Sequence, residues 1–284
     1  MEYIRKNIIL VPTDFTEVAD YAIEHAIGTA KSLNYEICLV HVINKETRSQ
    51  LKKDKLDKEA IHQRLEKKAN EIKANHNLKV TYVAKTGSIF TTIANVTRET
   101  GSNLVVMGTH GKVGTQKVFG SYAFKVIVAS PAPVMIVQKR AFEGGYKNIV
   151  LPLDDTLESK QKVKWAIYVA KKFQSTVHIF AMKETDEVLK RKVRHNMKQI
   201  NTILLQNNIL CTEKIADKVG NFSKQVVKHA VEIHADMIMI MTNPDQLVPS
   251  FILTPNDEKV IFNEAKIPVL CINPIDMNFQ VGGF

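Results

Sequence analysis

The feature that most constrains the fold of this chain is an internal repeat with an offset of 140 residues. The run Val11-Pro12-Thr13-Asp14, which closes a short apolar stretch near the start, returns as Leu151-Pro152-Leu153-Asp154. Apolar residues at helical spacing in positions 23–33 also match those in positions 163–173. Self-similarity at a fixed period is the mark of a duplicated structural unit. The 284 residues are therefore predicted to form two copies of one fold.

Each half of the sequence alternates strand-like and helix-like segments, with long charged helices predicted around residues 50–75 and 186–206. Most strand-like segments are continuous apolar runs, as expected when both faces of a sheet are covered. Strands that alternate with helices imply parallel crossover connections. The sequence thus predicts an α/β protein with two doubly wound, five-stranded parallel sheets. The predicted strands are residues 8–11, 37–42, 79–84, 104–107 and 134–137, then 148–151, 177–182, 212–216, 237–240 and 269–272.

The repeat also predicts the domain organisation. The first domain is expected at residues 1–140 and the second at residues 146–275. A short polar, glycine-containing linker around residues 139–147 joins them. Residues 276–284 have no periodic pattern and are predicted to be a tail on the surface.

Composition indicates a soluble, cytoplasmic protein. No signal peptide is visible at the start, and the apolar stretches fall far short of the roughly 20 residues that span a membrane. We therefore expect no membrane partner. Cys38, Cys211 and Cys271 stand singly in apolar surroundings, which favours small core residues in a reducing compartment.

The formal net charge of +10 raises the question of an anionic partner. Basic residues are interleaved with acidic ones, as in 52–55 and 65–68, and no aromatic residues accompany them for base stacking. We therefore expect anionic small molecules rather than nucleic acid. The nine histidines form no cluster with metal-ligand spacing, so no metal site is predicted.

Three segments of the first half should converge where a doubly wound sheet binds its ligands, beyond the carboxyl ends of the strands. These are Pro12-Thr13-Asp14, then Val42, and then the glycine-containing segment from Met107-Gly108 to Gly120-Ser121. Glycines expose backbone N–H groups to an oxyanion, and a helix N-terminus adds partial positive charge. Lys112 could neutralise phosphate, and Asp14 is placed to accept from a ribose hydroxyl.

With these residues the sequence resembles the universal stress protein family over its whole length. The resemblance implies a Rossmann-like fold of the nucleotide-binding alpha-hydrolase-like type, two of them in a pseudo-two-fold tandem. ATP-binding members carry Gly-x2-Gly-x9-Gly-Ser/Thr, whereas only eight residues separate Gly111 from Gly120-Ser121 here. By resemblance the nucleotide site would comprise Pro12, Asp14, Val42, Met107, Gly108, Gly111, Gly120 and Ser121.

The second half keeps Asp154 but lacks the loop. At an offset of 133 residues, Gly108 becomes Met241 and Gly111 becomes Pro244. A proline offers no N–H donor, and a methionine side chain would fill the space for a phosphate. We therefore do not expect the usual nucleotide site in this half.

Simpler interpretations stay open for the first half. Asp14 could only cap a turn or helix, and Gly108 and Gly111 could only form a tight turn. The leading hypothesis is a cytoplasmic stress-response regulator, not an enzyme, that binds ATP or a related adenine nucleotide and acts on an unidentified protein partner. The resemblance further implies that strands 134–137 and 269–272 pair as an intramolecular pseudo-dimer. The alternatives are an interaction scaffold without nucleotide and a slow nucleotide hydrolase, although neither Gly-x-Ser-x-Gly nor a Walker loop is present.

Overall fold

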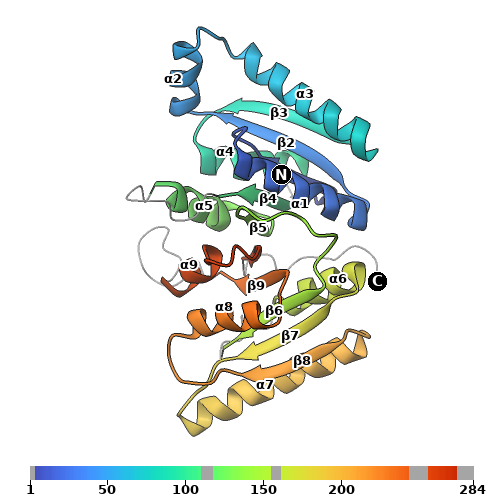
Figure 1. The fold of residues 1–284 in the computed structure, drawn as a ribbon, viewed down its shortest axis with the longest axis vertical. Coiled ribbons are helices and arrows are strands. Elements are labelled where there is room, and N and C mark those ends of the chain that lie inside the picture. The colour runs from blue at the N-terminus through green and yellow to red at the C-terminus, as the bar shows by residue number, and fades with distance from the viewer. Residues whose placement is uncertain (1–3, 110–117, 155–160, 243–254, 274–284) are drawn as a thin grey trace. The chain divides into compact units, whose positions relative to one another are not determined.

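A computed structural model describes residues 4–109, 118–154, 161–242 and 255–273. The chain divides into two compact units, Met1–Glu143 and Gly144–Phe284. Figure 1 traces both as ribbons coloured along the chain. Each unit is an α/β sandwich with one parallel sheet, so the predicted fold class is confirmed.

The sheet of the first unit has the strand order β3-β2-β1-β4-β5, and all its pairs are parallel. The chain adds strands in one direction from β1 to β3 and in the other direction from β4 to β5, so the order reverses between β1 and β4. Ligands of open parallel sheets bind at such a reversal, outside the carboxyl ends of the strands. The five strands are β1 (Lys6–Pro12), β2 (Glu36–Ile43), β3 (Val80–Thr86), β4 (Ser102–Gly108) and β5 (Val134–Val137).

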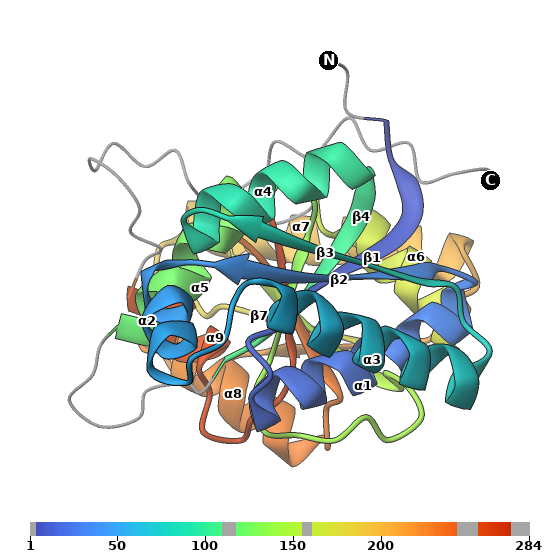
Figure 2. The ribbon, with the colours of Figure 1, turned by 90° about the horizontal axis from the view of Figure 1, so that it is seen from above.

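Helices cover both faces of this sheet. Figure 2 shows α4 on one side of β2 and β3, with α1 and α3 on the other. Helix α5, which follows β4, packs against α4. Ile9, Leu10 and Val11 in the centre of β1 are completely buried as a result, which explains the uninterrupted apolar run. The helices are α1 (Glu17–Leu33), α2 (Lys45–Lys53), α3 (Glu59–His76), α4 (Ile89–Thr100) and α5 (Val118–Ala129).

The prediction of one long helix at residues 50–75 is wrong, because the chain breaks it into α2 and α3. Lys55 adopts a left-handed φ of 56° and its N–H bonds to the carbonyl of Lys52. The amide of Leu56 then closes the end of α2 on the carbonyl of Leu51. A left-handed residue is a common way for a helix to end, and the mixed-charge sequence alone did not signal it.

The second unit repeats the arrangement with the strand order β8-β7-β6-β9-β10, again all parallel. Its strands are β6 (Asn148–Leu153), β7 (Thr176–Ala181), β8 (Cys211–Ile215), β9 (Met237–Met241) and β10 (Val269–Ile272). Its described helices are α6 (Val163–Phe173), α7 (Glu187–Gln206), α8 (Phe222–Glu232) and α9 (Pro255–Ile261). Of the helices in the described ranges, none combines the length and the apolar character needed to cross a membrane.

The first residues of the linker dock on α1 of their own unit. The ring of Phe142 lies where a Cβ atom at Gly28 would be, at 2.0 Å from that position, and packs edge-on against His25. The Nε2 of His25 donates to the carbonyl of Arg140 at 3.1 Å. Lys139 pairs with Glu17 in the first turn of α1. The linker is therefore not a free tether over residues 139–142.

Candidate functional site

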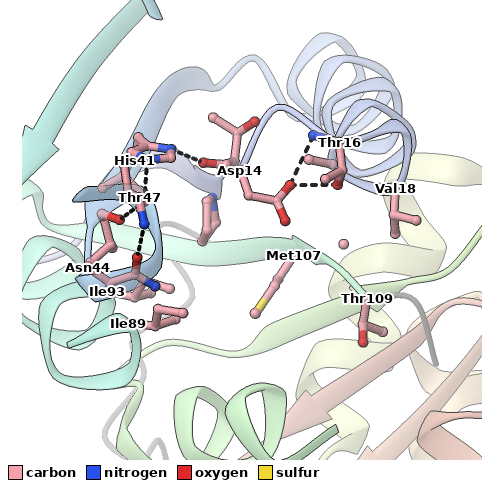
Figure 3. Close-up of a pocket in the computed structure, with 16 residues that line it drawn as sticks. Asp14, Thr16, Val18, His41, Asn44, Thr47, Ile89, Ile93, Met107 and Thr109 are labelled. Carbon is pink, nitrogen blue, oxygen red and sulfur yellow. Dashed lines mark hydrogen bonds between the residues drawn. The ribbon is translucent and has the colours of Figure 1, made fainter. Parts of the chain in front are cut away.

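A cavity of about 130 Å³ lies at the reversal point of the first unit (Figure 3). Its walls come from the carboxyl ends of β1, β2 and β4, and from the first turns of α1, α2 and α4. Such a volume accommodates about one six-membered ring. The lining residues are Pro12, Thr13, Asp14, Thr16, Val18, Ala19, Val40, His41, Val42, Asn44, Thr47, Ile89, Ile93, Met107, Gly108 and Thr109.

The structure brings six of the predicted site residues together around this cavity, namely Pro12, Thr13, Asp14, Val42, Met107 and Gly108. Gly111 and Lys112 lie outside the described residues. Gly120 and Ser121 fall in the first turn of α5, which starts at Val118, and their side chains are also outside the description. The phosphate-binding part of the prediction therefore stays a prediction.

Asp14 has one engaged and one available carboxylate oxygen. Its Oδ1 accepts from the backbone N–H of Thr16 at 3.0 Å and from the Thr16 hydroxyl at 2.6 Å. Thr16 is the N-cap residue of α1 but makes no side-chain cap bond, because its hydroxyl turns to Asp14 instead. No partner of Oδ2 is found among the described residues. The bonds to Thr16 engage one oxygen of this carboxylate and leave the other as an acceptor on an exposed residue of the cavity lining.

The turn that holds Asp14 is fixed from several directions. Thr13 is buried; its N–H donates to the carbonyl of Val40 at 2.9 Å, and its hydroxyl accepts from the N–H of Phe15 at 3.1 Å. Phe15 has a left-handed φ of 63°, which is uncommon for a side chain of this size. Its ring stacks on His41 and lies 5.9 Å from the guanidinium carbon of Arg64. The strained conformation is thus held by contacts of the ring with His41 and Arg64.

His41 connects this turn to α2. Its Nδ1 lies 2.8 Å from the carbonyl oxygen of Thr13, which can only accept, so Nδ1 carries the proton. Its Nε2, 3.2 Å from the Thr47 hydroxyl oxygen, is then free to accept. Burial lowers the pKa of His41 and Arg64 lowers it further, against the raising effects of the Thr13 carbonyl and Asp14. A neutral imidazole therefore joins two walls of the cavity.

Gly108 ends β4 where α1 begins. A Cβ atom at this position would lie 2.4 Å from the carbonyl oxygen of Val18 and 3.1 Å from the backbone nitrogen of Ala19. Only a residue without a side chain lets the first turn of α1 approach the strand so closely. Gly108 thus has a packing reason to be glycine, whether or not a ligand is bound.

Sequence reasoning did not select the other ten wall residues, among them His41, Asn44, Ile89 and Ile93. His41 precedes Val42 directly, but a lone histidine at a strand end has no specific signal. Asn44 follows a strand and opens a helix, which is the pattern of an N-cap, and that signal was available. The two isoleucines come from α4, whose contribution to the site depends on the crossover and cannot be seen in a local motif.

The corresponding strand end of the second unit differs. Register places Met241 beside Ile272 as it places Gly108 beside Val137, so the two residues are structural equivalents. Met241 carries a half-buried side chain at that position. Asn243 and Pro244 lie outside the described residues, as does the segment after Asp154. Nowhere in the described ranges do three potential metal-ligating side chains of His, Cys, Asp or Glu gather.

Comparison with known proteins agrees with this geometry. A doubly wound sheet with its reversal point at β1 and β4 defines a Rossmann-like α/β protein. A model of the universal stress protein family matches residues 6–138 and again residues 145–273. The chain therefore belongs to the universal stress protein family and carries two of its domains in tandem.

Relatives match either one half or the whole chain. The universal stress protein MJ0531 of Methanocaldococcus jannaschii is 29% identical over 144 residues, which cover 46% of this chain and 81% of that protein. MJ0577 of the same organism is 26% identical over 158 residues, covering 46% and 94%. A crystal structure of a universal stress protein from Archaeoglobus fulgidus superposes with a TM-score of 0.75 at 20% identity, covering 94% of this chain and 98% of that one. That last likeness establishes the fold of the tandem.

Proposed function

We propose that the first unit binds an adenine nucleotide, ATP or a close relative, and that the chain acts as a cytoplasmic stress-response regulator. Occupancy of the site would control an interaction with a protein partner. The observation that carries the proposal is the cavity, around which six residues chosen from sequence motifs come together. The resemblance to ATP-binding family members supports the choice of ligand.

The chemistry of the cavity suits a ring and a sugar. Val42, Ile89, Ile93 and Met107 give apolar surface for a flat base. The free Oδ2 of Asp14 is an acceptor for a ribose hydroxyl. The cavity has room for about one ring, so it would take part of the base, and the sugar would lie outside it, near the exposed Asp14. The phosphates fall to the segment after Thr109.

A calorimetric titration with ATP, ADP and AMP tests the proposal, and Asp14→Asn supplies the decisive variant. Asparagine keeps an Oδ1 for the two bonds from Thr16 but replaces the free acceptor by a donor. Loss of a hydrogen bond to a charged group costs about 1.5–3 kcal/mol. We expect binding to the parent protein and at least about tenfold weaker binding to the variant.

Asp154→Asn in the second unit is the matched control, because Asp154 ends the equivalent turn. It should bind as the parent does. A flat titration of the parent protein with all three nucleotides would rule out the nucleotide and favour an interaction scaffold. Equal or tighter binding by Asp14→Asn would remove Asp14 from the site, since loss of a negative charge alone favours an anionic ligand.

A further inference from the structure

The side chain of Asn44 has two ends in different environments. Asn44 is the N-cap residue of α2, and its Oδ1 accepts from the backbone N–H of Thr47 at 2.8 Å. The other end, Nδ2, has no hydrogen-bond partner among the residues that the structure describes. The side chain is half-buried and lines the cavity, where Figure 3 shows it on the same side as Ile89 and Ile93.

The orientation of this amide is determined by its cap bond. A backbone N–H can only donate, so the atom of Asn44 that faces Thr47 must be the oxygen. The NH₂ group is then necessarily the end without a protein partner. The cap bond engages the oxygen, so the end of the side chain that is left for a ligand is the NH₂ donor.

Neighbouring bonds hold this donor in place. The N–H of Asn44 donates to the carbonyl of Val42 at 2.9 Å. Thr47, whose N–H donates to Asn44, also has its hydroxyl oxygen 3.2 Å from the Nε2 of His41. His41 in turn bonds to the carbonyl of Thr13 at 2.8 Å. The donor is therefore pre-positioned by backbone and ring contacts, which lowers the entropy cost of using it.

A half-buried donor beside Val42, Ile89 and Ile93 is complementary to a flat apolar ligand that carries a hydrogen-bond acceptor at its edge. Adenine has three ring nitrogens of that kind, N1, N3 and N7. We propose that Asn44 determines base specificity in the first unit by donating from Nδ2 to one ring nitrogen of the base. The inference rests on the proposed nucleotide function and adds a residue that recognises the base.

Asn44→Asp and Asn44→Ser test the role of the donor apart from that of the cap. Asparagine, aspartate and serine are all good N-cap residues, so both variants should keep the unfolding midpoint of the parent. Neither has an NH₂ group. In calorimetry with ATP we expect each to bind at least about tenfold more weakly. Asn44→Ser is included because the added charge of aspartate would by itself repel the phosphates.

The second unit offers a matched control. Asp186 caps α7 there, accepting at Oδ1 from Val188 and Leu189 at 2.9 Å each. Asp186→Asn makes the opposite exchange at a cap outside the cavity, and it should leave the ATP affinity unchanged. An equal loss of affinity in this variant would show that the effect is not specific to the cavity and would overturn the proposal.

Analogues of ATP locate the acceptor. The parent should lose about tenfold with one of 1-deaza-, 3-deaza- and 7-deaza-ATP, in which a CH replaces one ring nitrogen, and should tolerate the other two. Asn44→Ser should show no further loss with the sensitive analogue, because the bond is already missing. Parent-like ATP binding by Asn44→Ser, or full tolerance of all three analogues by the parent, overturns the inference and leaves nucleotide binding intact. A parent protein that binds no ATP overturns both.

Discussion

The two units have the same strand order and the same parallel registers, yet they differ at the end of the fourth strand. The first unit has Gly108 there, and α1 starts at Glu17 with its backbone against that glycine. The second unit has Met241, and α6 begins at Val163 within the described residues. The two helices end in equivalent places, at Leu33 and Phe173, whereas the residues equivalent to the first turn of α1 lie outside the described part of the second unit. The sheets are thus alike, whereas the units differ at the end of the fourth strand and in the segment between the second and third strands, which holds α2 and α3 in one unit and α7 in the other.

The outer surfaces of these two helices differ as well. His25 and Gly28 of α1 receive the linker residue Phe142. At an offset of 140 residues, α6 has Trp165 and Tyr168, which pack edge-on against each other with ring centroids 6.1 Å apart. A later segment of the chain thus covers these positions on α1, whereas an aromatic pair occupies them on α6. Sequence repeats alone would suggest equal helices.

The largest expected effect follows from copying the second unit into the first with Gly108→Met. Backbone atoms of α1 occupy the position of the new Cβ, so the helix must move. Overpacking of this kind typically costs 1–3 kcal/mol, and we expect about 3 kcal/mol or more here, together with loss of ATP binding. Unfolding in urea should be followed by circular dichroism for both units and by the fluorescence of the single tryptophan, Trp165, for the second unit.

Met107→Leu is the control for Gly108→Met, because it alters the neighbouring cavity residue with little change in volume. It should cost less than about 1.5 kcal/mol. If Gly108→Met unfolds at the parent's midpoint, the close approach of α1 to β4 is not a constraint, and the comparison between the two strand ends loses its physical basis.

The second expected effect is a dependence of stability on pH, which arises from His25 and has no equivalent at Trp165, the matching residue of the second unit. Burial lowers the pKa of His25 from 6.5 to about 4, and the charge of Arg140 adds to this, against the raising effect of the bond to the Arg140 carbonyl. The unfolded chain therefore binds a proton first. Stability present above pH 6.5 is lost as the pH falls toward 4, by about 3 kcal/mol for this group.

His25→Gln provides the reference, because its amide can still donate to the Arg140 carbonyl but does not titrate. Urea unfolding at pH 7.5, 5.5 and 4.5 should show a steeper loss of stability for the parent than for the variant. The profile of the variant must be subtracted from that of the parent, because burial also lowers the pKa of His41, His178 and His229 in both proteins. Identical pH profiles for the two proteins would mean that His25 is not desolvated as the structure shows.

A smaller difference is expected between two helix starts. Asp186 makes side-chain cap bonds to α7, whereas Thr16 makes none to α1. Asp186→Ala should therefore cost about 1 kcal/mol and Thr16→Ala only a few tenths. Paired thermal melts would measure the difference. A Thr16→Ala variant that is the less stable of the two would show that the hydroxyl bond to Asp14 matters more than a helix cap.

The smallest effect concerns the ion pair of Lys139 with Glu17, which has no counterpart in the described part of the second unit. Both side chains are largely exposed, and exposed pairs contribute little. Lys139→Met should leave the thermal midpoint unchanged within error, in low salt and in 0.5 M salt alike. A clear, salt-sensitive drop would mean that the ion pair, rather than Phe142, holds the linker on α1.

The sequence predicted the sheets because most strands are local apolar runs and both units repeat their order; β8, with Thr212, Glu213 and Lys214, is an exception. It also predicted six of the sixteen residues that line the cavity, since Pro12 to Asp14, Val42, and Met107 to Gly108 lie at the ends of strands that must meet. It could not show that the oxygen Oδ1 of Asp14 is engaged by Thr16. It also missed Ile89 and Ile93, because their place in the wall depends on where the α4 crossover packs.

The break between α2 and α3 was missed for a different reason. Charged residues run through both helices, and the turn depends on the left-handed conformation of Lys55, a residue type without turn preference. Asn44 shows the opposite case. An asparagine between a strand and a helix is a common N-cap, but only the surrounding cavity shows that the other end of the same amide is available to a ligand.

The packing of Phe142 on Gly28 determines where the two units can be separated for expression on their own. Residues 139–144 fall between the two segments that match the family, so a shortened gene designed from family boundaries would omit this aromatic ring. A first unit cut after Val137 would leave the slot beside His25 open and its imidazole without the Arg140 carbonyl. A first unit made on its own should therefore extend past β5 to Phe142, the side chain that covers Gly28 and His25 of α1.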